Sequence, residues 1–254
     1  MRETYGASLP GLDLAALPGK LIVIEGTDGV GRTTQIELLK PWLEQEGHAV
    51  IDTGMTRSAL AGKGLKRAKQ GHTLGRITLT LFYATDFADR LEDQIVPALR
   101  AGFVVLTDRY IYSLIARSLV RGIDSAWVQN VFRFALKPDA IFYLRIGLED
   151  LIPRMVFSRG FEYWESGMDL HASEDMYESF CKYQTSLLEQ FDRLATEYNF
   201  EVIDGSKDVQ TVFEQLRSGI HQVLNGHPQR TIAVPPSDGR APAIRDNLSL
   251  APEQ

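Results

Sequence analysis

The chain has 254 residues, of which 44% are hydrophobic and 24% are charged, and its formal net charge is −6. These values are ordinary for a globular domain, and the negative charge argues against broad binding to nucleic acid or an anionic membrane. The single cysteine, Cys181, excludes an internal disulfide framework. No apolar run is long enough to cross a bilayer and no signal-peptide pattern is present, so a cytoplasmic protein is expected.

Composition divides the chain into three parts. Residues 1–18 contain two prolines and little periodicity, which predicts a loose leader. Residues 226–254 are rich in proline and are predicted to be a disordered tail. Residues 19–225 alternate short apolar runs with amphipathic stretches, the pattern of one α/β domain built from βαβ units.

Within that domain the apolar runs are short and rich in β-branched residues, which is typical of strands buried on both faces. The expected strands are 21–25, 49–52, 103–107, 140–144 and 200–203. The expected helices are 33–45, 73–100, 111–121, 125–136, 148–158, 174–197 and 208–223. We therefore predict a five-stranded parallel sheet with helices on both faces, and ligands beyond the carboxyl ends of the strands.

The first strand runs into a glycine loop that is followed by a helix. The loop residues are Gly26, Thr27, Asp28, Gly29, Val30, Gly31, Arg32, Thr33 and Thr34. Glycines allow successive backbone N–H groups to point at one anion, and the helix adds the positive end of its dipole. The spacing predicts a P-loop in which Arg32 reaches the β- and γ-phosphates and Thr33 binds Mg²⁺.

The usual lysine of this motif is arginine at position 32. Arginine keeps the positive charge but is planar, longer and forked. The alternative to a phosphate site is a glycine-rich turn between strand and helix that binds no ligand.

Residues 20–224 resemble the thymidylate kinase family, which phosphorylates dTMP to dTDP with ATP and Mg²⁺. The resemblance rests on four segments in the right order. They are the loop with Asp28 inside it, the stretch 81–86 leading to 96–99, Asp108-Arg109-Tyr110 after the third strand, and 137–144 before a lid at about 154–172. It implies a P-loop NTPase-type three-layer α/β fold with a short lid.

The resemblance also implies roles for individual residues. Asp28 would contact the sugar of the acceptor, Arg109 its phosphate, and Tyr83 its base, with Tyr110 beside Arg109. Arg57 and Phe87 stand at or near positions where the family has arginines, and we expect them to line the acceptor site in their place. Asp108 would organise Mg²⁺ together with Thr33. Arg32, Arg154 and Arg159 would neutralise charge on the transferring phosphoryl group.

Each role has a structural alternative. Asp108 would then cap the following helix, Arg109 would pair with a surface carboxylate, and Tyr83 would belong to the core. Arg154 and Arg159 would be solvated helix residues.

The chain departs from the family pattern mainly at arginines. Phe87 stands where the family has an arginine that reads the base, and Gly54 where another is expected, with Arg57 three residues on. Arg117 and Ser118 replace an expected tyrosine and glutamine, and the arginine of the lid motif is absent from 162–165. Two further expected arginines fall on Ser179 and Cys181.

Three functions follow from these observations. The leading hypothesis is an ATP-dependent nucleoside monophosphate kinase, with dTMP as acceptor and Mg²⁺ as cofactor. The alternatives are a related kinase with another nucleotide or deoxynucleoside acceptor, and an ATP-binding regulatory module with little turnover. The resemblance implies a homodimer, with the apolar helix over 76–99 at the interface.

Overall fold

The computed structural model describes residues 2–6, 9–72, 74–158 and 160–226. Its centre is a parallel sheet in the order β2-β3-β1-β4-β5. The strands are β1 (Lys20–Glu25), β2 (Val50–Gly54), β3 (Val104–Asp108), β4 (Ala140–Arg145) and β5 (Glu201–Asp204). The predicted five-stranded parallel sheet is confirmed, and each strand lies within one or two residues of its predicted position.

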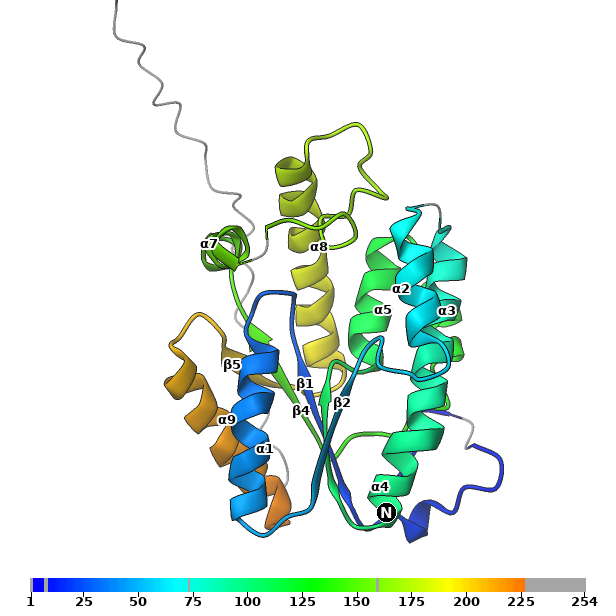
Figure 1. Cartoon of the computed structure of the whole chain (residues 1–254), viewed down its shortest axis with the longest axis vertical. Coiled ribbons are helices and arrows are strands. Elements are labelled where there is room, and N and C mark those ends of the chain that lie inside the picture. The colour runs from blue at the N-terminus through cyan, green and yellow to red at the C-terminus, as the bar shows by residue number, and fades with distance from the viewer. Residues whose placement is uncertain (1, 7–8, 73, 159, 227–254) are drawn as a thin grey trace, which may run out of the picture.

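Helices cover both faces of the sheet, which gives three layers (Figure 1). One face carries α1 (Arg32–Gln45), α7 (Leu148–Ser158) and α9 (Val209–Leu224). The other carries α3 (Arg76–Arg90), α4 (Val96–Arg100), α5 (Ile111–Val120), α6 (Ser125–Val131) and α8 (Met176–Glu197). Successive residues of a strand point to opposite faces and so belong to two hydrophobic cores. Leu21 and Val23 of β1 pack against the helices of the α3 and α5 face, and Ile22 and Ile24 against those of the α1 and α9 face.

The helix predicted over 73–100 is divided. After α3 the backbone makes a π-helical turn at Leu91–Ile95 before α4 begins. Pro97 has no N–H and its ring disfavours a regular α-helical bond to the preceding turn. The wider π turn just before Pro97 accommodates it within a continuous rod.

A short helix that the sequence did not indicate, α2 (Gly62–Gln70), follows β2. Its only buried residues are Gly62 and Leu65, so it has almost no apolar periodicity from which to predict it. It lies beside α3 (Figure 1).

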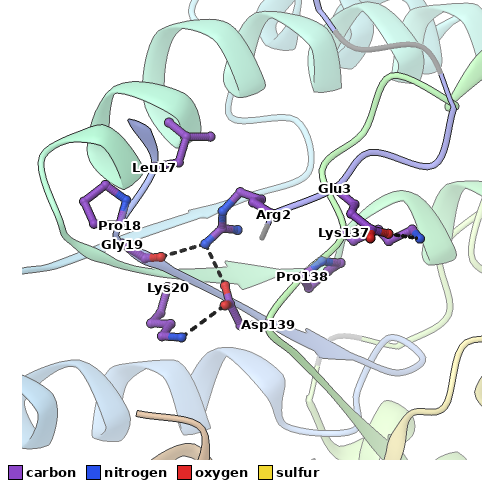
Figure 2. Close-up of a pocket in the computed structure, with 9 residues that line it drawn as sticks. All are labelled: Arg2, Glu3, Leu17, Pro18, Gly19, Lys20, Lys137, Pro138 and Asp139. Carbon is purple, nitrogen blue, oxygen red and sulfur yellow. Dashed lines mark hydrogen bonds and ion pairs between the residues drawn. The ribbon is translucent and has the colours of Figure 1, made fainter. Parts of the chain in front are cut away.

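The leader differs from its prediction, because the described part of it packs against the domain. Arg2 Nη2 donates to the carbonyl oxygen of Gly19 at 2.6 Å and to Asp139 Oδ2 at 2.8 Å. Its guanidinium lies in a cavity of about 370 Å³ at the amino ends of β1 and β4 (Figure 2). Thr4 forms a β-bridge with Leu136. The predicted disordered tail lies outside the described residues, apart from Gly226.

Candidate active site

The site lies at the point where the helices that follow neighbouring strands switch from one face of the sheet to the other. β1 and β3 are neighbours, yet α1 after β1 and α5 after β3 lie on opposite faces of the sheet. The register pairs Ile24 with Asp108, which places the start of the glycine loop beside the Asp-Arg-Tyr segment. In open α/β sheets such a crevice at the carboxyl ends of the strands is where ligands bind.

The glycine loop turns tightly and leaves one side open. Gly26, Gly29 and Gly31 have φ of 145°, 82° and 103°, in the region that favours glycine. A Cβ on Gly26 would lie 2.8 Å from the carbonyl oxygen of Leu144, whereas one on Gly31 would meet no atom of the described residues within 4 Å. The open side lies where α1 begins, and its first N–H groups are available to an anion there.

Arg32 is turned into this loop. Its Nη1 donates to the carbonyl oxygens of Gly26 and Thr27, and its Nε donates to Asp108 Oδ1 at 2.7 Å. The side chain is only 5% exposed. The guanidinium therefore ties the glycine loop to the end of β3.

Asp108 also faces the first turn of α1. Thr33 Oγ1 donates to Asp108 Oδ2 at 3.2 Å, so a hydroxyl and a carboxylate oxygen meet beside the loop. Asp108 does not cap the following helix, because the N-cap of α5 is Tyr110 and it receives no side-chain cap bond. The predicted pair of oxygen ligands is thus brought together.

Asp28 gathers three guanidinium groups around one buried carboxylate. Arg109 pairs with its Oδ1 and Arg117 with its Oδ2, while Arg32 Nη2 lies 3.7 Å from Oδ1. The carboxylate is 3% exposed. Arg109 is therefore part of a buried charge cluster at the end of β3, and the alternative of a surface ion pair does not hold.

The backbone at Arg109 is strained. Its φ is 68°, in the left-handed region that arginine rarely adopts. Such a conformation costs about 1–3 kcal/mol and persists only where neighbours enforce it. The Arg109 N–H donates to Ile24 O at 3.0 Å and Thr107 Oγ1 donates to Arg109 O at 2.7 Å. These bonds fix the direction in which the guanidinium leaves the strand.

The residues predicted for the acceptor base lie mostly in the core. Tyr83 is 7% exposed and its hydroxyl accepts a hydrogen bond from Lys69 Nζ at 3.3 Å. Phe87 and Tyr110 are fully buried, and their rings meet edge to face at 5.0 Å. The structure therefore places Phe87 and Tyr110 in the interior, where neither has surface to offer an acceptor.

Arg57 lies apart from the Asp28 cluster. Its Nη1 donates to Asp52 Oδ2 at 2.9 Å, and 43% of its side chain is exposed. It stands just after β2, at the same carboxyl edge of the sheet as Arg109.

The lid region is divided between α7 and the segment that follows it. Arg154 Nη1 donates to Val30 O at 3.3 Å and Nη2 to Ser206 O at 3.0 Å, which docks α7 over the glycine loop. Arg159 lies outside the described residues. Trp164 is buried and its Nε1 donates to Lys69 O at 2.9 Å, so the lid packs against the end of α2.

Besides Arg117, two buried ionisable residues near the site were not among the predicted site residues. Glu25, the last residue of β1, accepts hydrogen bonds from Tyr110 N and from Ser113 N and Oγ. Burial raises the pKa of its carboxyl, and these hydrogen bonds oppose the rise. Arg121 forms a two-point ion pair with Asp169 at 2.8 and 3.0 Å, which fastens the lid to α5.

Comparison with known proteins agrees with this geometry. The family model for thymidylate kinase matches residues 24–216. The chain belongs to the thymidylate kinase family. Its matched part runs from the end of β1 into α9, and so includes every strand after β1 and the whole glycine loop.

Individual thymidylate kinase relatives match over nearly their whole length. A probable thymidylate kinase 2 of Saccharolobus solfataricus is 38% identical over 82% of this chain and 98% of its own. A probable thymidylate kinase of Thermococcus kodakarensis is 31% identical over 80% of this chain and 98% of its own. A thymidylate kinase of Brachyspira hyodysenteriae is 29% identical over 81% of this chain and 95% of its own. No helix among the described residues is long and apolar enough to span a membrane.

Proposed function

We propose that the protein is a cytoplasmic dTMP kinase that transfers the γ-phosphoryl group of ATP to dTMP and releases dTDP and ADP. The observation that carries this proposal is the buried cluster in which Arg32, Arg109 and Arg117 surround Asp28 beside an open glycine loop. Three guanidinium groups at the carboxyl ends of two adjacent strands suit a reaction between two phosphate-bearing substrates.

The reaction requires positioning and charge neutralisation more than proton transfer. The acceptor phosphate is already ionised at neutral pH, so one of its oxygens can attack the γ-phosphorus in line without a general base. Arg109, fixed by its left-handed backbone, would hold the acceptor phosphate. Arg32 donates to Gly26 O and Arg154 to Val30 O, both in the glycine loop, and the two guanidinium groups would neutralise the phosphoryl oxygens.

Mg²⁺ fits the oxygen atoms beside the loop. Thr33 Oγ1 and Asp108 Oδ2 lie 3.2 Å apart, and hydroxyl and carboxylate oxygens are the ligands this ion prefers. These two residues would hold Mg²⁺ directly or through its water molecules. When bound, the ion would neutralise charge on the β- and γ-phosphates.

We also propose a homodimer formed through α3. Ile77 and Leu81 lie one helical turn apart on this helix, and each is 45% exposed. Two large apolar side chains on one exposed face are suited to a partner copy of the same surface.

Steady-state ADP release with MgATP and dTMP tests the activity. We expect turnover with dTMP to exceed that with dAMP, dGMP or dCMP. An Arg109→Ala variant should lower kcat/KM for dTMP by about 1,000-fold through loss of a charged phosphate contact. An Arg217→Ala variant, exposed on α9, serves as the control. ATP binding without acceptor-dependent ADP release would refute the kinase and leave the regulatory module.

A further inference from the structure

The cavity at the amino ends of β1 and β4 lies at the opposite end of the sheet from the glycine loop. β1 begins at Lys20, which lines this cavity, and ends at Glu25, directly before the loop. A strand of six residues spans about 20 Å, so the cavity is separate from the candidate active site. Its volume of about 370 Å³ is within the range of small-molecule sites. A ligand bound here would be additional to ATP and its acceptor.

Arg2 supplies the buried charge of this cavity, and its side chain is only 6% exposed. Nη2 makes both of the hydrogen bonds, to Gly19 O and Asp139 Oδ2, whereas Nε and Nη1 are buried and have no hydrogen-bond partner among the described residues. Buried donors without a partner are uncommon in proteins, and they destabilise the fold unless something accepts from them. Unused N–H groups on a guanidinium that lines a cavity point to an anion as the missing partner.

The other ionised groups of the cavity favour an anion as well. Three cationic and two acidic side chains line it: Arg2, Lys20, Lys137, Glu3 and Asp139. The carboxylate of Asp139 is already compensated, because it accepts hydrogen bonds from a guanidinium, an ammonium group and a backbone N–H. One positive charge is therefore left over, and it lies beside the unused donors of Arg2.

The third cation of the cavity is held only by an exposed ion pair. Lys137 Nζ lies 2.6 Å from Glu3 Oε2, and the two side chains are 45% and 64% exposed (Figure 2). An ion pair this exposed contributes little to stability. An anion in the cavity can therefore replace Glu3 as the partner of Lys137 at little cost.

We propose that this cavity is a second binding site, which takes the phosphate group of a small phosphorylated molecule. Guanidinium N–H groups form charge-assisted hydrogen bonds with phosphate oxygens, and an ammonium group adds a further charge. A phosphate monoester carries a charge of about −1.5 to −2 at pH 7, which Arg2 and Lys137 together match better than they match a carboxylate. The apolar walls of Leu17, Pro18 and Pro138 are available to the rest of the molecule.

The position of Arg2 in the chain gives this site a structural consequence. Arg2 belongs to the leader and precedes the segment that matches the thymidylate kinase family. The other lining residues include Lys20 at the start of β1 and Asp139 just before β4. A bound phosphate would therefore fasten the leader to the amino ends of two central strands. The site does not depend on the proposed function.

Isothermal titration of the full-length protein with inorganic phosphate tests this proposal. An excess of MgADP and dTMP is present throughout to occupy the candidate active site. We expect one phosphate per chain with a Kd of about 1 mM or lower, and acetate to bind about tenfold more weakly. Ribose 5-phosphate distinguishes the source of the phosphate group. A lower Kd for it than for inorganic phosphate would identify a sugar phosphate, and an equal Kd would identify free phosphate; either result supports the site.

Variants of the two cations test the assignment. Arg2→Met should raise the Kd for phosphate about 100-fold through loss of charged hydrogen bonds, and Lys137→Met about fivefold. Lys137→Met keeps the bonds of Arg2 to Gly19 and Asp139, so it tests the site even if Arg2→Met lowers the Tm. Arg193→Met, exposed on α8, is the matched control and should leave the Kd unchanged.

Arg109→Ala separates this site from the proposed kinase. Phosphate binding that persists in Arg109→Ala and is lost in Arg2→Met supports the second site, whether or not the protein releases ADP. Binding that is lost in Arg109→Ala and unchanged in Arg2→Met would place the anion in the active site and overturn the proposal. A wild type that binds no phosphate in the presence of MgADP and dTMP would also overturn it, while turnover with dTMP would leave the proposed function intact.

Discussion

Arg32 Nε lies 2.7 Å from Asp108 Oδ1, and the same guanidinium donates through Nη1 to two carbonyl oxygens of the glycine loop. The planar guanidinium thus donates at the same time to a carboxylate at the end of β3 and to backbone carbonyls of the loop. An ammonium is a point charge on a single atom and cannot occupy both positions. The arginine is therefore integrated into the loop and is more than a lysine substitute.

This relationship predicts the effect of restoring the usual lysine. Arg32→Lys loses at least one charged hydrogen bond, so we expect kcat/KM for ATP to fall about tenfold. Arg32→Ala should lower it by about 100-fold or more. Steady-state kinetics with varied MgATP measure both. A rise in activity for Arg32→Lys would mean that the arginine is an impaired lysine.

A second prediction concerns pH and the buried carboxyl of Glu25. Burial raises its folded-state pKa above the value of about 4.3 in an unfolded chain. Between these two pKa values the native state binds more protons than the unfolded state. This group's contribution to the free energy of unfolding therefore decreases as pH rises through that window.

Glu25→Gln removes this dependence while keeping the partners. The amide oxygen can accept from Tyr110 N and Ser113 N, and the amide nitrogen can donate to Ser113 Oγ. We expect the variant to gain stability relative to the wild type as pH rises from 5 to 8. Urea unfolding at several pH values measures the difference. Glu189→Gln, exposed on α8, should show no such trend.

A third prediction tests the attachment of the leader. Tyr5 packs edge to face on Tyr112 and Tyr198, with centroids 6.3 and 5.4 Å away. Tyr5→Ala removes these contacts and should lower the free energy of unfolding by about 2 kcal/mol. Tyr177→Ala, at a side chain that is 40% exposed, should cost much less. If both variants lost the same free energy of unfolding, the packing of the leader would contribute little to stability.

The sequence predicted the sheet better than the side-chain environment of the site. Strands such as β3 are short, apolar and β-branched, so their positions follow from local pattern. Phe87 was expected at the acceptor because of its place in a motif, but ring contacts from Tyr110, Phe132 and Phe134 bury it. These partners come from later segments of the chain, and periodicity does not identify them.

The charge cluster illustrates the same limit. Asp28 and Arg117 are 89 positions apart, and only the folded sheet brings α5 beside the glycine loop. An arginine within the apolar stretch 111–121 was the available signal in the sequence. Its partner could not be identified, because local propensity carries no information on contacts between distant elements. The prediction of a loose leader was wrong for the same reason, because Arg2 donates a hydrogen bond to Asp139, which lies far along the chain.

The last prediction concerns the proposed dimer. Leu81→Asp places a charge on the exposed apolar face of α3 that Ile77 shares. A charge buried in an interface without a partner costs several kcal/mol, enough to dissociate a dimer of moderate affinity. We expect sedimentation equilibrium to give twice the chain mass for the wild type and one chain mass for Leu81→Asp. Val209→Asp, at a side chain on α9 that is 51% exposed, should remain dimeric. A wild type that sediments as a monomer at micromolar concentration would contradict the dimer, and the exposed side chains of α3 would then need another partner.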